Sequence, residues 1–352
     1  MHPALAVARA LRHAQPGLEV DFLGGARGHE RRLLAGGEFA YHQLVVRSLR
    51  STDAGLHTLL DPIRLALAIP QAWWLLGRLR PAVVFTTGGY LAVPLVLAAR
   101  ARGIPSLVWE GNVIPGRATA AVARLATRVA VSFPPTADAF GDRAFVSGTP
   151  IRSFAGIERA AARTRFGATD TDRLLLVFGG SQAVARIDAA IDGSLDRLVL
   201  DWRVVHLAGE AGLRDAEARR ARLPDELRDR YRPLAELSDG MAEALVAADL
   251  VLGRAGSSTC AEVAAVGAAS ILVPYPFAGA HQRANAAWLA DAGACVLVDD
   301  ADLDPNRLLA EVSALRDDGR RAALAGAVRR LGRPDAAQAI ARELLAMAGV
   351  AS

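Results

Sequence analysis

The chain has 352 residues, a length typical of two domains of roughly 150–180 residues each. Hydrophobic residues make up 52% and charged residues 22% of it, which excludes a disordered or collagen-like protein. The net charge of +4, carried by arginines without any lysine, is too small for a dedicated nucleic-acid binder, so no nucleic-acid partner is expected.

The chain also offers little for metal or disulfide chemistry. Its two cysteines, Cys260 and Cys295, are too few for a disulfide scaffold or a cysteine-rich zinc site, and we expect both to be buried small hydrophobes. The sequence has no Asp-x-Asp pair at a strand end and no histidine cluster with metal-ligand spacing. No metal and no cofactor are therefore expected. No apolar run reaches the roughly 20 residues that cross a bilayer.

Short apolar runs alternate with longer amphipathic stretches along nearly the whole chain. This alternation predicts an α/β protein with parallel sheets and right-handed crossovers. The clearest expected helices lie at residues 91–102, 259–266 and 282–292. The expected strands lie at residues 20–23, 82–86, 106–109, 128–132, 174–178, 203–207, 250–252, 270–273 and 295–298.

The turn around Gly148-Thr149-Pro150 is the expected domain boundary. The pattern predicts two doubly wound domains, residues 1–150 and 151–333, that face each other across a cleft. Residues 334–352 are expected to form a final helix that begins near Pro334 and packs back on the first domain.

The first half opens on a helix instead of a strand, with Pro3 in the first helical turn. A doubly wound domain needs a strand before that helix, and this first strand is central in the sheet. We therefore expect the chain as given to lack the first strand and first glycine loop of this domain, and the domain to fold poorly.

Two glycine-rich turns in the second half suit a phosphate group. Residues 179–182, Gly-Gly-Ser-Gln, follow the strand at 174–178, and residues 253–259 follow the strand at 250–252. Backbone N–H groups at such turns approach anions, and a helix N-terminus favours negative charge. Glu262 can then accept two hydrogen bonds from vicinal sugar hydroxyls. The alternative is that both are ordinary tight turns with helix caps. The spacing of their glycines does not match the GxGxxG fingerprint, so a nicotinamide dinucleotide site is not expected.

Polar residues also follow strands elsewhere in the chain. Tyr90 and Glu110 lie just after strands of the first half, at the sheet edge where ligands bind. Glu110 is either an acid, base or orienting group, or a solvated loop carboxylate. Residues 281–286, His-Gln-Arg-Ala-Asn-Ala, suit sugar hydroxyls.

Residues 59–79 carry two tryptophans among leucines, which indicates either a buried helix or a patch that lies on anionic lipid.

Taken together, these segments resemble the MurG family of bacterial peptidoglycan N-acetylglucosaminyltransferases. The resemblance covers essentially the whole chain, and the order and spacing of its motifs are more specific than any one motif. The motifs are Pro3-Ala4-Leu5-Ala6-Val7-Ala8, Gly88-Gly89-Tyr90, Glu110-Gly111-Asn112, Gly179-Gly180-Ser181-Gln182, Met241-Ala242-Glu243-Ala244, Arg254-Ala255-Gly256 with Glu262, and His281-Gln282-Arg283-Ala284-Asn285-Ala286.

The resemblance implies a GT-B fold and transfer of GlcNAc from UDP-GlcNAc to the 4-hydroxyl of MurNAc on lipid I, with inversion, to form lipid II. It also implies a peripheral protein at the cytoplasmic face of the bacterial cell membrane, with residues 59–79 as the docking surface on anionic lipid. Glu262 would hold the ribose hydroxyls, Gln282 the GlcNAc hydroxyls, and Ser238 lies where uracil is held. Tyr90 and Glu110 are candidates for the acceptor side. The implied substrate-binding residues are Asn112, Arg152, Ser181, Ser238, Arg254, Ser257, Ser258, Thr259, Cys260, Ala261, Glu262 and Gln282.

One departure from the family concerns the base. The glycine-rich loop of the family ends in a histidine three residues before the proline that matches Pro3, so the expected catalytic histidine would lie before Met1. The hypothesis is that Met1 is an incorrectly assigned start.

Three other functions stay open: a GT-B transferase with another lipid or natural-product acceptor, a UDP-GlcNAc 2-epimerase, and a non-catalytic UDP-GlcNAc-binding remnant.

Overall fold

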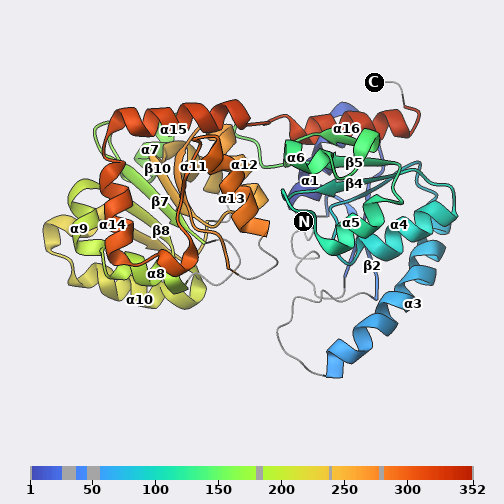
Figure 1. Cartoon of the computed structure of the whole chain (residues 1–352), viewed down its shortest axis with the longest axis horizontal. Coiled ribbons are helices and arrows are strands. Elements are labelled where there is room, and N and C mark those ends of the chain that lie inside the picture. The colour runs from blue at the N-terminus through green and yellow to red at the C-terminus, as the bar shows by residue number, and fades with distance from the viewer. Residues whose placement is uncertain are drawn as a thin grey trace. The chain divides into compact units, whose positions relative to one another are not determined.

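The computed structural model describes residues 2–25, 37–45, 56–179, 185–237, 240–276 and 281–350. Of residues 56–63, only the backbone is described. The chain divides into two compact units (Figure 1). Unit 1 comprises Met1–Ile151 with Asp335–Ser352, and unit 2 comprises Arg152–Pro334.

Unit 1 contains two parallel sheets. One is the pair β1–β2, and the other has the strand order β3-β4-β5-β6. Among the described residues no strand precedes α1, and no hydrogen-bonded ladder joins β1 to β3. The strands are β1 (Asp21–Gly24), β2 (Ala40–Gln43), β3 (Val84–Thr86), β4 (Ser106–Glu110), β5 (Arg128–Val131) and β6 (Ala144–Val146).

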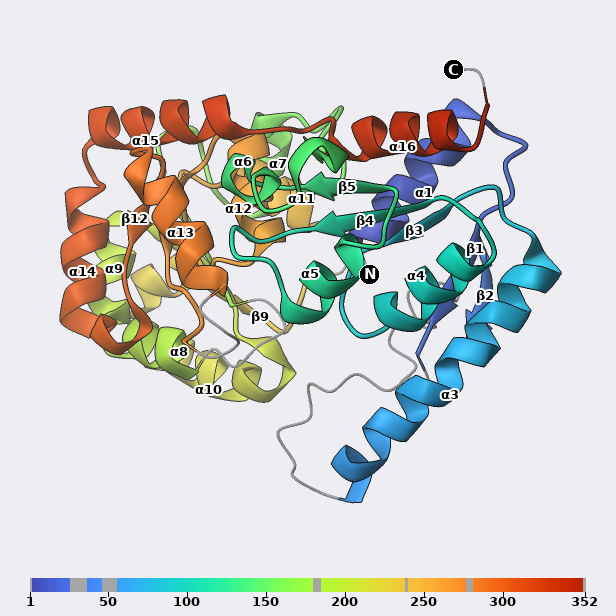
Figure 2. The same cartoon turned by 45° about the vertical axis from the view of Figure 1, so that its right-hand side comes forward.

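The C-terminal helix belongs to unit 1 and lies beside its first helix (Figure 2). Ile340 and Leu344 of this last helix are buried in one cluster with Val7 and Trp109. The Trp109 indole also donates to the carbonyl oxygen of Gly148 over 3.1 Å, which ties β4 to the end of the unit. The helices of unit 1 are α1 (His2–Ala14), α3 (Leu56–Leu79), α4 (Ala92–Ala101), α5 (Arg117–Ala123), α6 (Pro134–Ala137), the short 3-10 helix η1 (Gly141–Arg143) and α16 (Ala336–Met347).

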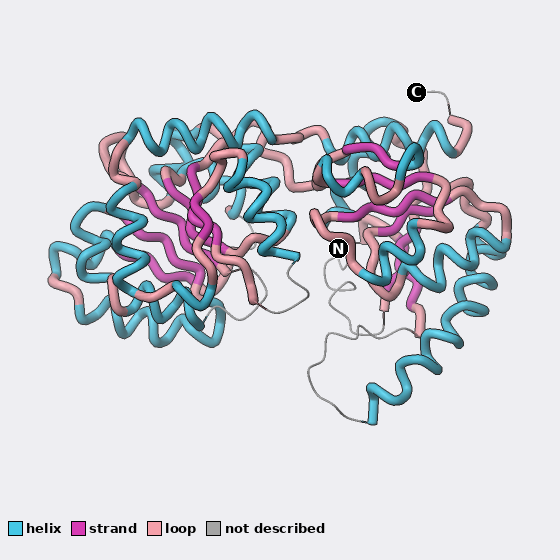
Figure 3. Tube along the Cα trace, in the orientation of Figure 1, coloured by secondary structure: helices cyan, strands magenta, loops and turns pink. Residues whose placement is uncertain are grey.

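Unit 2 is built around one six-stranded parallel sheet with the order β12-β11-β10-β7-β8-β9. Helices cover the sheet, as the tube in Figure 3 shows. The strands are β7 (Leu174–Phe178), β8 (Arg203–Leu207), β9 (Tyr231–Leu234), β10 (Leu250–Gly253), β11 (Ala269–Leu272) and β12 (Val296–Leu297). The helices are α7 (Arg159–Arg165), α8 (Ala185–Asp192), α9 (Leu195–Asp201), α10 (Gly209–Arg222), η2 (Asp225–Arg230), α11 (Met241–Ala247), α12 (Ser257–Val266), α13 (His281–Asp291), η3 (Asp300–Asp302), α14 (Pro305–Ala314) and α15 (Asp318–Leu331).

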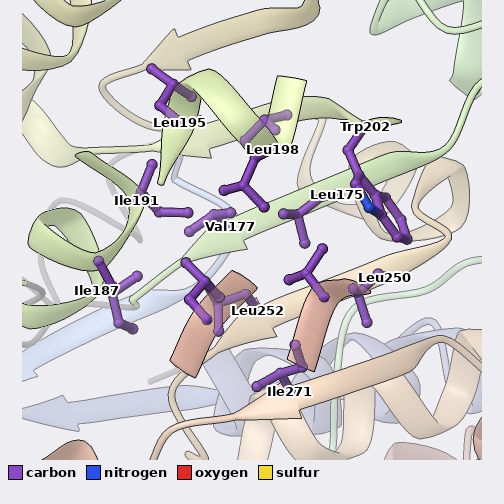
Figure 4. Packing of buried hydrophobic residues seen from close by; sticks show 14 of the residues in the cluster. Leu175, Val177, Ile187, Ile191, Leu195, Leu198, Trp202, Leu250, Leu252 and Ile271 are labelled. Atoms are coloured by element: carbon purple, nitrogen blue, oxygen red, sulfur yellow. The ribbon is translucent and has the colours of Figure 1, made fainter. Parts of the chain in front are cut away.

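The core of unit 2 explains why its strands read as continuous apolar runs. Every residue of β7 is buried, because helices cover both faces of a parallel sheet. Figure 4 shows Leu175 and Val177 of β7 among Ile191, Leu198 and Leu252. Each fully buried side chain of this size contributes about 1.5–3 kcal/mol. The resulting core holds in place the carboxyl ends of β7, β10 and β11, which lie at one edge of the sheet.

The predicted α/β architecture with parallel sheets is confirmed. Each expected strand overlaps an observed one, while β2, β6 and β9 were not expected. Cys260 and Cys295 are both buried and unpaired, as predicted. Burial raises the pKa of the Cys295 thiol to about 12, so this thiol stays protonated at neutral pH.

Candidate functional site

The carboxyl edge of the unit 2 sheet gathers most of the residues that the sequence singled out. Because β10 and β11 are parallel neighbours, they end at the same edge. Residues 254–256 follow β10 and lead into α12, whose N-cap residue Gly256 has no side-chain cap. The first N–H groups of a helix have no partner within it, so they remain available to an anion. Ser257, Ser258 and Thr259 are only partly buried there.

Glu262 lies in the second turn of α12 and pairs with Arg152. Nε of Arg152 donates to Oε1 of Glu262 over 2.8 Å, and the Glu262 side chain is 8% exposed. Burial raises the pKa of the Glu262 carboxyl, and the attraction of Arg152 counteracts this rise. An ionised carboxylate has about four lone-pair positions, so Glu262 can accept further hydrogen bonds besides that of Arg152.

Arg254, just before α12, is held by an acidic residue of the short helix η3. Its Nη1 donates to Oδ1 of Asp300 over 2.5 Å, and the two side chains are 6% and 14% exposed. The same Nη1 lies 3.4 Å from the carbonyl oxygens of Val273 and Pro274, which follow β11. Arg254 therefore connects the segment after β10 to the segment after β11. Asp300 could not be singled out from the sequence, because it lies in none of the motifs and reaches Arg254 only through the fold.

Helix α13 ties the same two segments together. Asn285 is fully buried, and its Nδ2 donates to the carbonyl oxygen of Ala255 over 3.2 Å. Oε1 of Gln282 accepts from the backbone N–H of Tyr275 over 2.9 Å. The amide-rich motif that the sequence assigned to sugar hydroxyls thus has a scaffolding role in this structure.

In unit 1, Glu110 organises the loop that follows β4. The residue is buried, and its Oε1 accepts from the backbone N–H and the Nδ2 of Asn112 over 2.9 and 3.0 Å. Its Oε2 accepts from the backbone N–H of Gly116 over 2.9 Å. The alternative that Glu110 is a solvated loop carboxylate is wrong, because backbone and amide donors hold both oxygens. Tyr90, in contrast, is exposed.

The predicted site residues fall into two groups. Tyr90, Glu110 and Asn112 belong to unit 1, and the remaining described ones belong to unit 2. Ser181 and Ser238 lie outside the described residues. Within the described part of the chain, no group of three or more His, Cys, Asp or Glu side chains is arranged to hold a metal ion.

Helix α3 combines a buried face with an exposed aromatic surface. Ala68, Ala72 and Leu76 are buried in the core of unit 1. Leu67, Trp73 and Trp74, in contrast, are 57%, 49% and 56% exposed. Guanidinium groups lie over both indoles, with Arg102 at 3.9 Å from the Trp73 ring and Arg78 at 5.7 Å from the Trp74 ring. In the described part of the chain, every helix is too short or too polar to span a bilayer.

Comparison with known proteins places these features in a family. The chain matches the N-terminal domain of glycosyltransferase family 28 over residues 1–131 and the C-terminal domain over residues 174–340. A similar curated protein, from Salinibacter ruber, is named UDP-N-acetylglucosamine--N-acetylmuramyl-(pentapeptide) pyrophosphoryl-undecaprenol N-acetylglucosamine transferase. It is 38% identical over 351 residues, 99% of this chain and 94% of that protein. A relative of the same name from Moorella thermoacetica is 36% identical over 98% of this chain and 95% of its own length.

Solved structures agree with this placement. The crystal structure of Acinetobacter baumannii MurG superimposes with a TM-score of 0.77 at 29% identity, covering 98% of this chain and 95% of that one. The glycosyltransferase of kitacinnamycin has a TM-score of 0.69 at 20% identity, covering 97% and 95%, and shares the fold alone. The alignments do not support the predicted loss of a first strand and glycine loop. The chain has the GT-B fold and belongs to glycosyltransferase family 28, and within it to the MurG family.

Proposed function

We propose that this protein is an inverting glycosyltransferase that moves GlcNAc from UDP-GlcNAc to lipid I, undecaprenyl-diphospho-MurNAc-pentapeptide, and thereby forms lipid II for peptidoglycan. The observation that carries the proposal is the 38% identity, over 99% of the chain, to a transferase named for these substrates. The carboxyl edge of unit 2 supports the donor half of the reaction independently.

The donor nucleotide binds at the start of α12. The first N–H groups of α12, at residues 257–259, receive the diphosphate, and the helix dipole adds to the attraction. Cys260 and Ala261 continue the same turns. Glu262 accepts hydrogen bonds from the ribose hydroxyls, and Arg152 contacts the nucleotide beside it. Gln282, whose Oε1 accepts from the backbone N–H of Tyr275, offers its Nε2 to the GlcNAc hydroxyls from α13.

The reaction is an in-line displacement at the anomeric carbon of GlcNAc. The 4-hydroxyl oxygen of the acceptor forms the new bond, and the bond from that carbon to the diphosphate oxygen breaks. UDP leaves with the electron pair, and the N-terminus of α12 stabilises the negative charge that develops on it. The hydroxyl proton passes to a base, which is not assigned among the described residues.

The acceptor is a lipid, and α3 supplies a surface that suits its membrane. Leu67, Trp73 and Trp74 offer apolar side chains, and Arg78 and Arg102 offer positive charge beside the indoles. Tryptophan and arginine are favoured where acyl chains meet anionic headgroups. The protein thus docks peripherally at the cytoplasmic face of the cell membrane, with Tyr90 and the loop that Glu110 holds on the acceptor side.

The test is a transfer assay with purified protein, radiolabelled UDP-GlcNAc and lipid I in detergent. The expected products are labelled lipid II and an equal amount of UDP. Label that reaches only a diacylglycerol or natural-product acceptor would indicate another GT-B transferase. Conversion of UDP-GlcNAc without any acceptor would indicate an epimerase, and binding by calorimetry without turnover would indicate a binding remnant.

A further inference from the structure

Asp300 joins two arginines from different parts of unit 2. Its Oδ1 lies 2.5 Å from Nη1 of Arg254, and its Oδ2 lies 3.3 Å from Nε of Arg186 on α8. Each carboxylate oxygen therefore has its own cationic partner. Asp300 itself lies on η3, after β12, far along the chain from both arginines.

The Arg254 side of this contact is buried and geometrically defined. The guanidinium lies beside the backbone ends of β11 and 5.5 Å from the centre of the Tyr275 ring. A buried guanidinium needs a counter-charge and hydrogen-bond acceptors, and Asp300 supplies the charge. Arg254 is two residues before Gly256, the N-cap of α12, so the contacts of Arg254 hold the chain next to the start of this helix.

The Arg186 side of the contact is more exposed but has a separate physical reason. Arg186 lies in the first turn of α8, where the positive end of the helix dipole disfavours a cation. The carboxylate of Asp300 offsets this repulsion. One acidic side chain thus pairs with an arginine near the beginning of each of two helices, α8 and α12.

We infer that Asp300 is a positioning residue for donor binding, which holds Arg254 and Arg186 so that the start of α12 keeps the geometry a diphosphate needs. The inference rests on the proposed donor site at α12. It gives Arg254 a different role from the expected one: the guanidinium acts through the fold, because it is engaged with Asp300 and backbone carbonyls and is 6% exposed.

A matched control exists at the other end of β10. Asp249 precedes β10 and pairs with Arg163 and Arg159 over 2.9 and 2.7 Å, and its side chain is 20% exposed. Its pairs resemble those of Asp300 in number and burial, but they lie at the amino end of the strand. Asp249→Asn therefore removes a comparable ion-pair cluster without disturbing the start of α12.

The experiment compares Asp300→Asn with Asp249→Asn in the full chain. UDP affinity is measured by calorimetry, donor KM and kcat by the transfer assay, and Tm by scanning fluorimetry. We expect both variants to lower Tm. Only Asp300→Asn should raise the Kd of UDP and the donor KM, by about tenfold, with a much smaller change in kcat.

A Kd and KM for Asp300→Asn within twofold of those for Asp249→Asn would overturn the inference and leave Asp300 a stability residue. If Asp300→Asn does not fold, Arg186→Ala decides, because half of the Arg186 side chain is exposed. A raised UDP Kd at unchanged Tm supports the inference, and an unchanged Kd overturns it. The wild-type protein is measured before the variants. If it binds UDP but transfers no GlcNAc, the proposed function is wrong, but the comparison of UDP Kd values still tests the role of Asp300.

Discussion

Nε of Arg152 lies 2.8 Å from Oε1 of Glu262, although 110 positions separate the two residues in the chain. Arg152 is the first residue of unit 2, and Glu262 is buried on the helix that carries the proposed diphosphate site. The carboxylate proposed to meet the ribose is thus desolvated, and a cation at its side favours its ionised form. Several predictions about binding, stability and pH depend on this balance.

The first prediction concerns ribose recognition. Glu262→Gln replaces a charged acceptor by a neutral amide, so UDP binding should weaken by about 10- to 100-fold, since hydrogen bonds to charged groups contribute about 1.5–3 kcal/mol. Calorimetry with UDP and with 2′-deoxy-UDP checks the cause. The variant should lose most of the preference for UDP. An unchanged preference would show that another group reads the ribose.

The same substitution should stabilise the fold. Burial raises the pKa of Glu262 above its ordinary value of 4.5. Because this pKa is raised in the folded state, the folded protein favours the protonated carboxyl. The resulting gain in the free energy of unfolding is present below about pH 4.5 and is lost as pH rises through the folded-state pKa. Glutamine does not ionise, so Glu262→Gln does not lose this contribution. The Tm of the variant minus the Tm of the wild type should therefore increase as pH rises from about 4.5 to neutrality. Scanning fluorimetry across this range measures the difference, and a difference that shrinks with rising pH would contradict the account.

Arg152→Ala should change the pH dependence of donor binding. Arg152 lowers the pKa of Glu262, so its removal raises that pKa further. The loss of UDP affinity on acidification should then begin at a higher pH in the variant than in the wild type. Arg159→Ala is the control, because Arg159 is also a partly exposed, ion-paired arginine of unit 2. Identical pH profiles for Arg152→Ala and the wild type would show that Arg152 does not set the charge of Glu262.

Removal of the exposed indoles of α3 should weaken membrane binding. The variant Trp73→Ala with Trp74→Ala loses two amphipathic side chains that are about half exposed, so its folding should change little. Sedimentation with phosphatidylglycerol vesicles should show a severalfold lower bound fraction. Leu200→Ala, at an exposed leucine of α9 in unit 2, is the control and should bind as the wild type does. Equal binding of both variants would exclude α3 as the docking surface.

Most of the fold could be predicted from the sequence because buried parallel strands have a clear pattern. Runs such as residues 174–178 are apolar throughout, since helices cover both faces of the sheet. The strands that were missed, β2, β6 and β9, all lie at sheet edges. An edge strand pairs on one side only, so β2 and β9 tolerate polar residues and even Pro233 and lack the apolar signal. Strand β6 is apolar but has only three residues, too few for a clear pattern.

The site was less predictable, because its contacts join residues that are distant in sequence. The glycine turn before α12 and Glu262 carry a local signal, and the resemblance supplied Arg152. Nothing local indicates that Arg152 reaches Glu262, or that Asp300 reaches Arg254 across 46 positions. The role of Glu110 was equally hidden, because a carboxylate that closes a loop and a solvated one have the same sequence context.

The most direct test of the account measures labelled GlcNAc transfer to lipid I by the wild type and Glu262→Gln, over a titration of UDP-GlcNAc. We expect labelled lipid II from the wild type and, for the variant, a donor KM raised by about 10- to 100-fold. A wild type that binds UDP-GlcNAc but forms no lipid II, or a variant with an unchanged donor KM, would contradict it.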